Sequence, residues 1–174
     1  MQPSDQRAWQ PFAQELAQQG FTALTFDFRG YGKSKGRQIY GQLGLDVLAA
    51  EAFLRDSGFT RIVCMGASMG GTACAKAALS PGLTGLVVIS SPLSMGSPLQ
   101  LDTSDFPKLT LPKLFVVAKG DVSFVDSVKL MYELSPDPKD MVVLPGGAHG
   151  TNMFDTPDGT ALRELLLKFA KELP

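Results

Sequence analysis

The sequence has no apolar run long enough to cross a membrane and no excess of positive charge. No stretch approaches the about 18 apolar residues that a membrane-spanning helix needs, and the first residues lack the basic and apolar regions of a signal peptide. The formal net charge is -1, with Lys and Arg scattered along the chain. We therefore expect a soluble, cytoplasmic protein that binds neither membrane nor nucleic acid.

Cysteine and histidine are scarce. The 174 residues include two cysteines, Cys64 and Cys74, and one histidine, His149. Cys64 falls in an expected strand and Cys74 in an expected helix, so we expect buried thiols rather than a disulfide or metal ligands. Internal repeats, low-complexity tracts and linkers are also lacking, and the length suits a single domain over residues 1–174.

Short valine-rich or aromatic runs alternate with segments of helical period, which is typical of a mainly parallel sheet with helices on both faces. The expected strands are FTALTFDF at 21–28, RIVCM at 61–65, and the runs GLVVIS, KLFVVA and MVVL. Helices are expected before Gly20 and Gly58, after Ser68, between the last two strands, and at the C-terminus after a cap near Thr156 or Asp158. The proline-rich stretch 91–112 predicts a loop over the carboxyl ends of the strands, where open α/β sheets bind ligands.

The sequence Gly66-Ala67-Ser68-Met69-Gly70 has the form G-x-S-x-G. The motif alone is weak, because about one comparably glycine-rich sequence in ten would contain it by chance. Here it follows an apolar run directly and opens an alanine-rich helix. This strand-turn-helix setting predicts a nucleophile elbow, with Ser68 exposed at a helix N-terminus that favours developing negative charge.

A serine hydroxyl needs a base within hydrogen-bond reach, and His149 is the one imidazole in the chain. It lies in the loop PGGAHG after a predicted strand. The histidine in turn needs a carboxylate that orients it. Asp121, at the end of KLFVVAKGD, is the candidate, and it gives the chain order serine, acid, histidine that is expected with a nucleophile elbow. The other candidates for the acid are Asp126 and, in the preceding loop, Asp102 and Asp105.

A different class of protein is suggested by Gly32-Lys33-Ser34 after a predicted strand, which is similar to the end of a phosphate-binding P-loop. That motif also requires glycine five residues before Gly32, where this chain has Asp27. The incomplete motif disfavours a nucleotide-binding function.

The segments LTFDFRGYGKSKG, GASMGG, KGDVSFV and GGAHG together resemble the α/β-hydrolase superfamily, in particular its cap-less esterases and dienelactone-hydrolase-like members. The resemblance covers almost the whole chain and implies an α/β-hydrolase fold that needs no cofactor. It implies acyl transfer by Ser68, Asp121 and His149. It also implies a structural role for the turn after 21–28, formed by Asp27, Arg29, Gly30, Gly32 and Ser34.

The chain departs from the family at its start, where members have three more strands. The resemblance therefore implies an N-terminally truncated fold. The loop after the third of these strands donates one oxyanion-hole N–H in the family. Here we expect the Met69 N–H as one donor and Met1 or Gln2, with Gln2 preferred, as the second. Without the third strand, the expected strands at 21–28 and 61–65 would either pair directly or leave a sheet edge open, through which copies of the chain could form a homo-oligomer.

These features predict hydrolysis of small or medium carboxylic esters, thioesters or lactones through an acyl-enzyme on Ser68. The loop 91–112 is too short for a large lid and offers Leu93, Met95, Leu99 and Phe106 as apolar lining. The alternative is an impaired or inactive protein of the same fold, because losing one oxyanion donor costs about 10²- to 10³-fold in rate.

Overall fold

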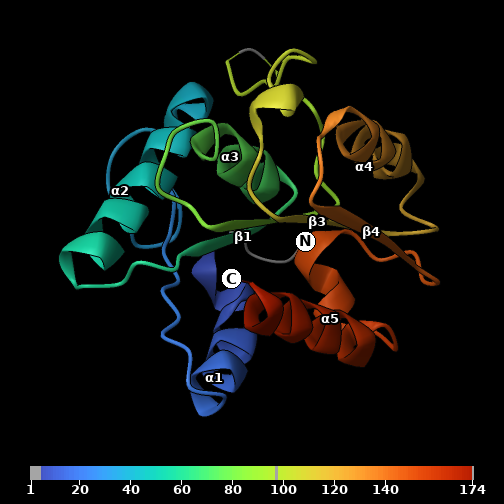
Figure 1. Ribbon diagram of the computed structural model, residues 1–174, viewed down its shortest axis with the longest axis horizontal. Helices are drawn as coiled ribbons and strands as arrows, with labels where there is room; N and C mark the ends of the chain where they lie inside the picture. Colours follow the sequence, from blue (N-terminus) through green and yellow to red (C-terminus); the bar gives the residue numbers. More distant parts are fainter. Residues whose placement is uncertain (1–4, 97, 174) are drawn as a thin grey trace. The chain divides into compact units, whose positions relative to one another are not determined.

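The computed structural model describes residues 5–96 and 98–173. Its contacts divide the chain into two compact units, Met1–Ile39 and Tyr40–Pro174. A single domain over 1–174 stays a prediction. All strands assigned in the described residues belong to the second unit (Figure 1).

The first unit begins with the short 3-10 helix η1 (Gln6–Ala8) and helix α1 (Gln10–Gln18). The predicted first helix is therefore confirmed. Gly20, with a φ of +86°, follows its end, and this is a conformation that glycine adopts at little cost.

The prediction of a strand at 21–28 was wrong, since these residues carry no assigned strand or helix. Aromatic and β-branched residues favour extended backbone, but a strand also needs a hydrogen-bonded neighbour. None of the ladders found among the described residues includes this segment.

The turn that follows 21–28 is held together by Asp27. Its carboxylate accepts hydrogen bonds from the backbone N–H groups of Gln6 and Lys33, each at 2.8 Å, and the Ser34 hydroxyl donates to the Asp27 carbonyl at 2.6 Å. Burial raises the pKa of Asp27, but the hydrogen bonds from Gln6 and Lys33 outweigh it and hold the pKa below its usual value. The hydroxyl of Ser34 is thus occupied in holding the turn.

The second unit contains a four-stranded parallel sheet in the order β1-β2-β3-β4. Its strands are β1 (Val63–Ala67), β2 (Gly85–Ile89), β3 (Lys113–Ala118) and β4 (Lys139–Leu144). Every residue of β2 and β3 is buried, as expected for central strands. The strands predicted at RIVCM, GLVVIS, KLFVVA and MVVL are therefore confirmed, with β1 shifted two residues toward Ser68 and with β1 and β4 only partly buried.

Helices cover both faces of this sheet (Figure 1). They are α2 (Leu43–Asp56), α3 (Met69–Ala77) and α4 (Val122–Leu134) on one face, and α5 (Gly159–Glu172) on the other. The unit also has three 3-10 helices, namely η2 (Tyr40–Gln42) directly before α2, η3 (Phe106–Lys108) between α3 and α4, and η4 (Gly150–Asp155) between α4 and α5. Within the described ranges, no helix is both long and apolar enough to cross a membrane.

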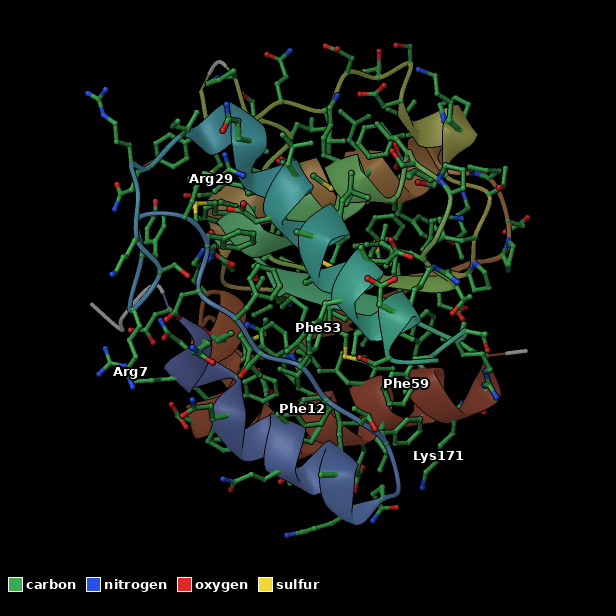
Figure 2. All side chains as sticks on the ribbon, turned by 90° about the vertical axis from the view of Figure 1, so that its left-hand side faces the viewer. Arg7, Phe12, Arg29, Phe53, Phe59 and Lys171 are labelled. Carbon is green, nitrogen blue, oxygen red and sulfur yellow. A yellow bond between two sulfur atoms is a disulfide. The ribbon has the colours of Figure 1, made fainter. Side chains whose placement is uncertain are left out.

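Helix α2 buries one side and exposes apolar residues on another. Leu43, Gly44 and Val47 are buried. Phe53 is 60% exposed, and Phe59, just beyond the helix, is 39% exposed; both are labelled in Figure 2. Phe53 therefore lies on the exposed side of α2.

The two cysteines form a disulfide, so the prediction of free buried thiols was wrong. Cys64 in β1 and Cys74 in α3 have Cα atoms 5.8 Å apart, within the range that a disulfide spans. Their separation of 10 residues gave no sign of this, because the contact arises only when α3 folds back onto β1. Disulfides are rare in the reducing cytosol, so this bond stands against the cytoplasmic location, which stays a prediction.

Candidate active site

Ser68 lies at the turn from β1 to α3 with φ +50° and ψ -125°. Non-glycine residues seldom adopt such a conformation, and it costs about 1–3 kcal/mol. The ladder holds the turn, since the Ser68 N–H donates to the Ile89 carbonyl in β2 at 2.8 Å. This strained turn between a strand and a helix is the geometry of a nucleophile elbow.

Two glycines make the elbow possible. A side chain at Gly66 would collide with the carbonyl of Gly70, and one at Gly71 would collide with the hydroxyl of Ser91. The close approach of β1 and α3 therefore depends on hydrogen atoms at these positions.

His149 and Asp121 form a hydrogen-bonded pair, with His149 Nδ1 and Asp121 Oδ2 2.9 Å apart. Asp121 follows β3 and is buried, with 8% of its side chain exposed, while 35% of the His149 side chain is exposed. Because a carboxylate only accepts hydrogen bonds, Nδ1 of His149 is the donor and Nε2 is left for other chemistry.

Glycines also bring the Asp121 and His149 loops together. Gly120 donates its N–H to the Gly146 carbonyl at 2.8 Å. A Cβ on Gly120 would lie 2.9 Å from the Cα of Gly147. The buried carboxylate of Asp158, at the predicted N-terminus of α5, accepts the Gly146 N–H at 2.9 Å instead of capping the helix.

The His149 loop also lies against the elbow. A Cβ on Gly150 would lie 3.5 Å from Ala67 Cβ and 3.9 Å from Ser68 Cβ. Among the residues that the structure describes, no hydrogen bond joins Ser68 to His149. Catalytic hydrogen bonds often form only when substrate is bound. The contact between the two loops is therefore what places His149 near Ser68.

The alternative acids are placed elsewhere. Asp126 is exposed on α4, and Asp102 accepts a hydrogen bond from Gln100. Asp105 forms ion pairs with Lys76 and Lys108 at 3.1 and 3.2 Å. Of the four carboxylates considered, Asp121 is the one that contacts His149.

The two oxyanion-hole candidates are placed differently by the structure. Met69 is the first residue of α3 and follows Ser68 directly. Gln2, like Met1, lies outside the described residues, so its role stays a prediction. Among residues 5–96 and 98–173, no group of three or more His, Cys, Asp or Glu side chains could hold a metal ion.

Two residues near the site were not predicted from the sequence. The ring of Phe124 lies 4.2 Å from the ring of His149, centroid to centroid. Ser90, at the end of β2, has a φ of +48° and a buried hydroxyl with no hydrogen-bond partner in the described part of the chain. Phe124 follows Asp121 by three residues, a spacing that places both in one helical turn, but its contact depends on the course of the His149 loop.

Part of the predicted apolar lining is not available to a ligand. Leu99 and Phe106 are 1% and 0% exposed, so they belong to the core rather than to a pocket wall. Met95 is 37% exposed and Leu93 is partly exposed. The sequence could not separate them, because all four are apolar residues in one irregular loop.

The parallel sheet, the elbow and the acid–histidine pair at its carboxyl edge define an α/β-hydrolase. A model of the family described as "Serine aminopeptidase, S33" matches residues 5–114. The chain belongs to this family, within the α/β-hydrolase superfamily.

Curated relatives include the uncharacterized protein YfhR of Escherichia coli, in strain K12 and in O157:H7. Each is 27% identical over 182 residues, which covers 91% of this chain and 63% of the relative. The chain thus spans less than two thirds of the length of these relatives.

Solved structures show the same fold at lower identity. A monoacylglycerol lipase of Paleococcus ferrophilus matches with a TM-score of 0.80 at 15% identity, over 95% of this chain and 89% of that one. An esterase of Pyrococcus furiosus matches with a TM-score of 0.81 at 20% identity, over 96% and 77%. A dienelactone hydrolase of Anabaena variabilis matches with 0.78 at 21% identity, over 96% and 79%.

Proposed function

We propose that this protein is a serine hydrolase that cleaves small or medium carboxylic esters through an acyl-enzyme on Ser68. The main support is that His149 is hydrogen-bonded to Asp121 at 2.9 Å and that the loop of His149 lies against the strained Ser68 elbow. Structural neighbours that include an esterase, a lipase and a dienelactone hydrolase support the choice of an ester or lactone.

The proposed reaction has two halves. Ser68 Oγ attacks the ester carbonyl carbon and passes its proton to Nε2 of His149, while Asp121 holds Nδ1 and stabilises the imidazolium. The imidazolium then protonates the departing alcohol, leaving the acyl group on Ser68. Water attacks this ester with His149 as base, and collapse of the tetrahedral intermediate releases the acid and restores Ser68.

The negative oxygen formed in each half needs hydrogen-bond donors. We assign the Met69 N–H as one, since Met69 opens α3 beside Ser68 and helix N-termini favour negative charge. The Gln2 N–H is the second in this proposal.

The acyl group is proposed to lie against exposed apolar side chains at this edge. Val122 follows Asp121 directly and is 76% exposed, the highest value among the large exposed apolar residues. Met95 and Leu93 in the 91–112 loop are the further candidates. A short, open surface of this kind suits small or medium acyl chains better than long ones.

Turnover of p-nitrophenyl esters of increasing acyl length tests the proposal, with alanine p-nitroanilide as the amide counterpart. We expect ester hydrolysis that Ser68→Ala abolishes and that Ser80→Ala, which alters an exposed serine after α3, leaves unchanged. Faster cleavage of the anilide would favour a peptidase. Folded wild-type protein that turns over neither substrate would favour the inactive alternative.

A further inference from the structure

The first turn of α4 contacts His149 twice. Asp121, at the start of the helix, binds Nδ1 at 2.9 Å, and the Phe124 ring lies against the imidazole with centroids 4.2 Å apart and planes tilted by 35°. The turn itself is fixed, since the Phe124 N–H donates to the Asp121 carbonyl at 2.9 Å. Carboxylate and phenyl ring therefore act on His149 from one rigid element.

The two contacts restrict different motions. A hydrogen bond at Nδ1 fixes one edge of the imidazole but still allows the ring to swing about that edge. A side chain with 35% exposure has room for such motion. The Phe124 ring lies against the imidazole and opposes this swing, so it helps to keep Nε2 directed toward one place.

The contact also depends on charge. An aromatic ring attracts a cation whose centre lies within about 6 Å of its centroid, by about 0.5–1 kcal/mol at partly exposed sites. His149 would be neutral before Ser68 reacts and cationic once it has taken the proton. An interaction that strengthens during the reaction raises kcat rather than substrate affinity.

We propose that Phe124 is a positioning residue, which orients the His149 imidazole with its ring and stabilises the imidazolium formed during ester cleavage. This inference rests on the proposed function for its kinetic part only. Asp121 pairs with His149 and is retained in every Phe124 variant, so the effect of Phe124 is measured with this charge in place.

Kinetics of Phe124→Leu test the inference. Leucine keeps an apolar cover but removes the aromatic face, so we expect kcat to fall by about 2- to 5-fold with KM unchanged. Phe124→Tyr keeps the face and should restore kcat. Phe53→Leu, which alters an exposed phenylalanine on α2, is the matched control. An unchanged kcat in Phe124→Leu, or equal losses in the leucine and tyrosine variants, would overturn the inference.

A measurement that does not depend on enzyme activity can test the role of Phe124 separately from the proposed ester hydrolysis. Because the chain has one histidine, its ring protons can be followed by NMR in tag-free protein without ambiguity. We expect upfield ring-current shifts in the wild type that persist in Phe124→Tyr and disappear in Phe124→Leu, or in Phe124→Met if leucine prevents folding. Shifts that do not change refute the contact, whereas shifts with the expected pattern in a protein without esterase activity refute the proposed function alone.

Discussion

At the scale of single residues, the candidate site depends on how Asp121 holds His149. The buried carboxylate accepts from Nδ1 and so, in the proposed mechanism, selects the tautomer whose Nε2 can receive a proton from Ser68. This role needs a group that only accepts hydrogen bonds at this position. Asparagine has nearly the same shape, yet its amide group can donate and favours the wrong tautomer.

We therefore expect Asp121→Asn to lower kcat for p-nitrophenyl esters by about 10³- to 10⁴-fold with little change in fold. Asp126→Asn is the matched control, because Asp126 is an exposed carboxylate on the same helix. Steady-state kinetics and circular dichroism of both variants provide the comparison. Equal activities of the two variants would show that Asp121 has no role in the mechanism.

Lys113 is a second residue whose environment has a measurable consequence. Its side chain is buried, and its ammonium group donates to the carbonyls of Pro136 and Pro138 at 2.7 and 3.1 Å. Burial, aided by the charge of Lys139, lowers the pKa of Lys113 from 10.5 to about 8. The unfolded chain thus binds this proton more tightly than the folded protein does.

Between pH 8 and 10.5 the unfolded state therefore holds more protons, and the Lys113 contribution to the free energy of unfolding rises with pH. The full rise corresponds to about 3 kcal/mol. Urea unfolding at a series of pH values should show that Lys113→Met lacks this rise, while Lys129→Met, at an exposed position on α4, retains it. Parallel pH profiles for wild type and Lys113→Met would contradict the assignment.

At the scale of elements, the Cys64–Cys74 disulfide joins the two elements that hold Ser68. It closes a loop of 10 residues between β1 and α3, and loops of this length gain about 2–3 kcal/mol from cross-linking. The elbow lies inside this loop, so the bond stabilises the strained turn together with its neighbours.

Reduction with a dithiol should therefore lower the free energy of unfolding by about 2–3 kcal/mol. Urea unfolding with and without the reductant measures the effect. The double variant Cys64→Ala and Cys74→Ala serves as the control, since its stability should be low and insensitive to reductant. An unfolding midpoint of the wild-type protein that is the same with and without the dithiol would show that the disulfide does not stabilise the fold.

Element type was largely predictable, because valine-rich runs and helical periods reflect burial within one segment. The strands β2 and β3 and the helix after Ser68 follow from local sequence. Contacts between distant segments were not predictable in this way. The failed strand at 21–28, the disulfide and the Phe124–His149 contact each depend on a partner whose position only the tertiary fold decides.

At the scale of the whole molecule, the two edge strands of the sheet, β1 and β4, differ in charge. In the described residues β1 pairs only with β2, and its sequence VCMGA carries no charge. The opposite edge, β4, carries Lys139 and Asp140, and charged residues discourage edge-to-edge pairing. Association of two copies through β1 is therefore a prediction.

Light scattering after size-exclusion chromatography should give twice the chain mass at high concentration. Val63→Lys places a charge on the β1 edge and should give the single-chain mass, while Val143→Lys on β4, at a position already 45% exposed, should leave the dimer intact. A single-chain mass for wild type at every concentration would rule out this association.

We propose that Ser68 is a nucleophile activated by His149, and a fluorophosphonate probe, which reacts with activated serines, can test this by labelling. Mass spectrometry of the folded wild-type protein should find one phosphonate adduct, on the peptide that contains Ser68, and His149→Ala should slow its formation by orders of magnitude. Labelling of wild type at another residue, or labelling of Ser68 at the same rate in His149→Ala, would show that Ser68 is not a nucleophile activated by His149.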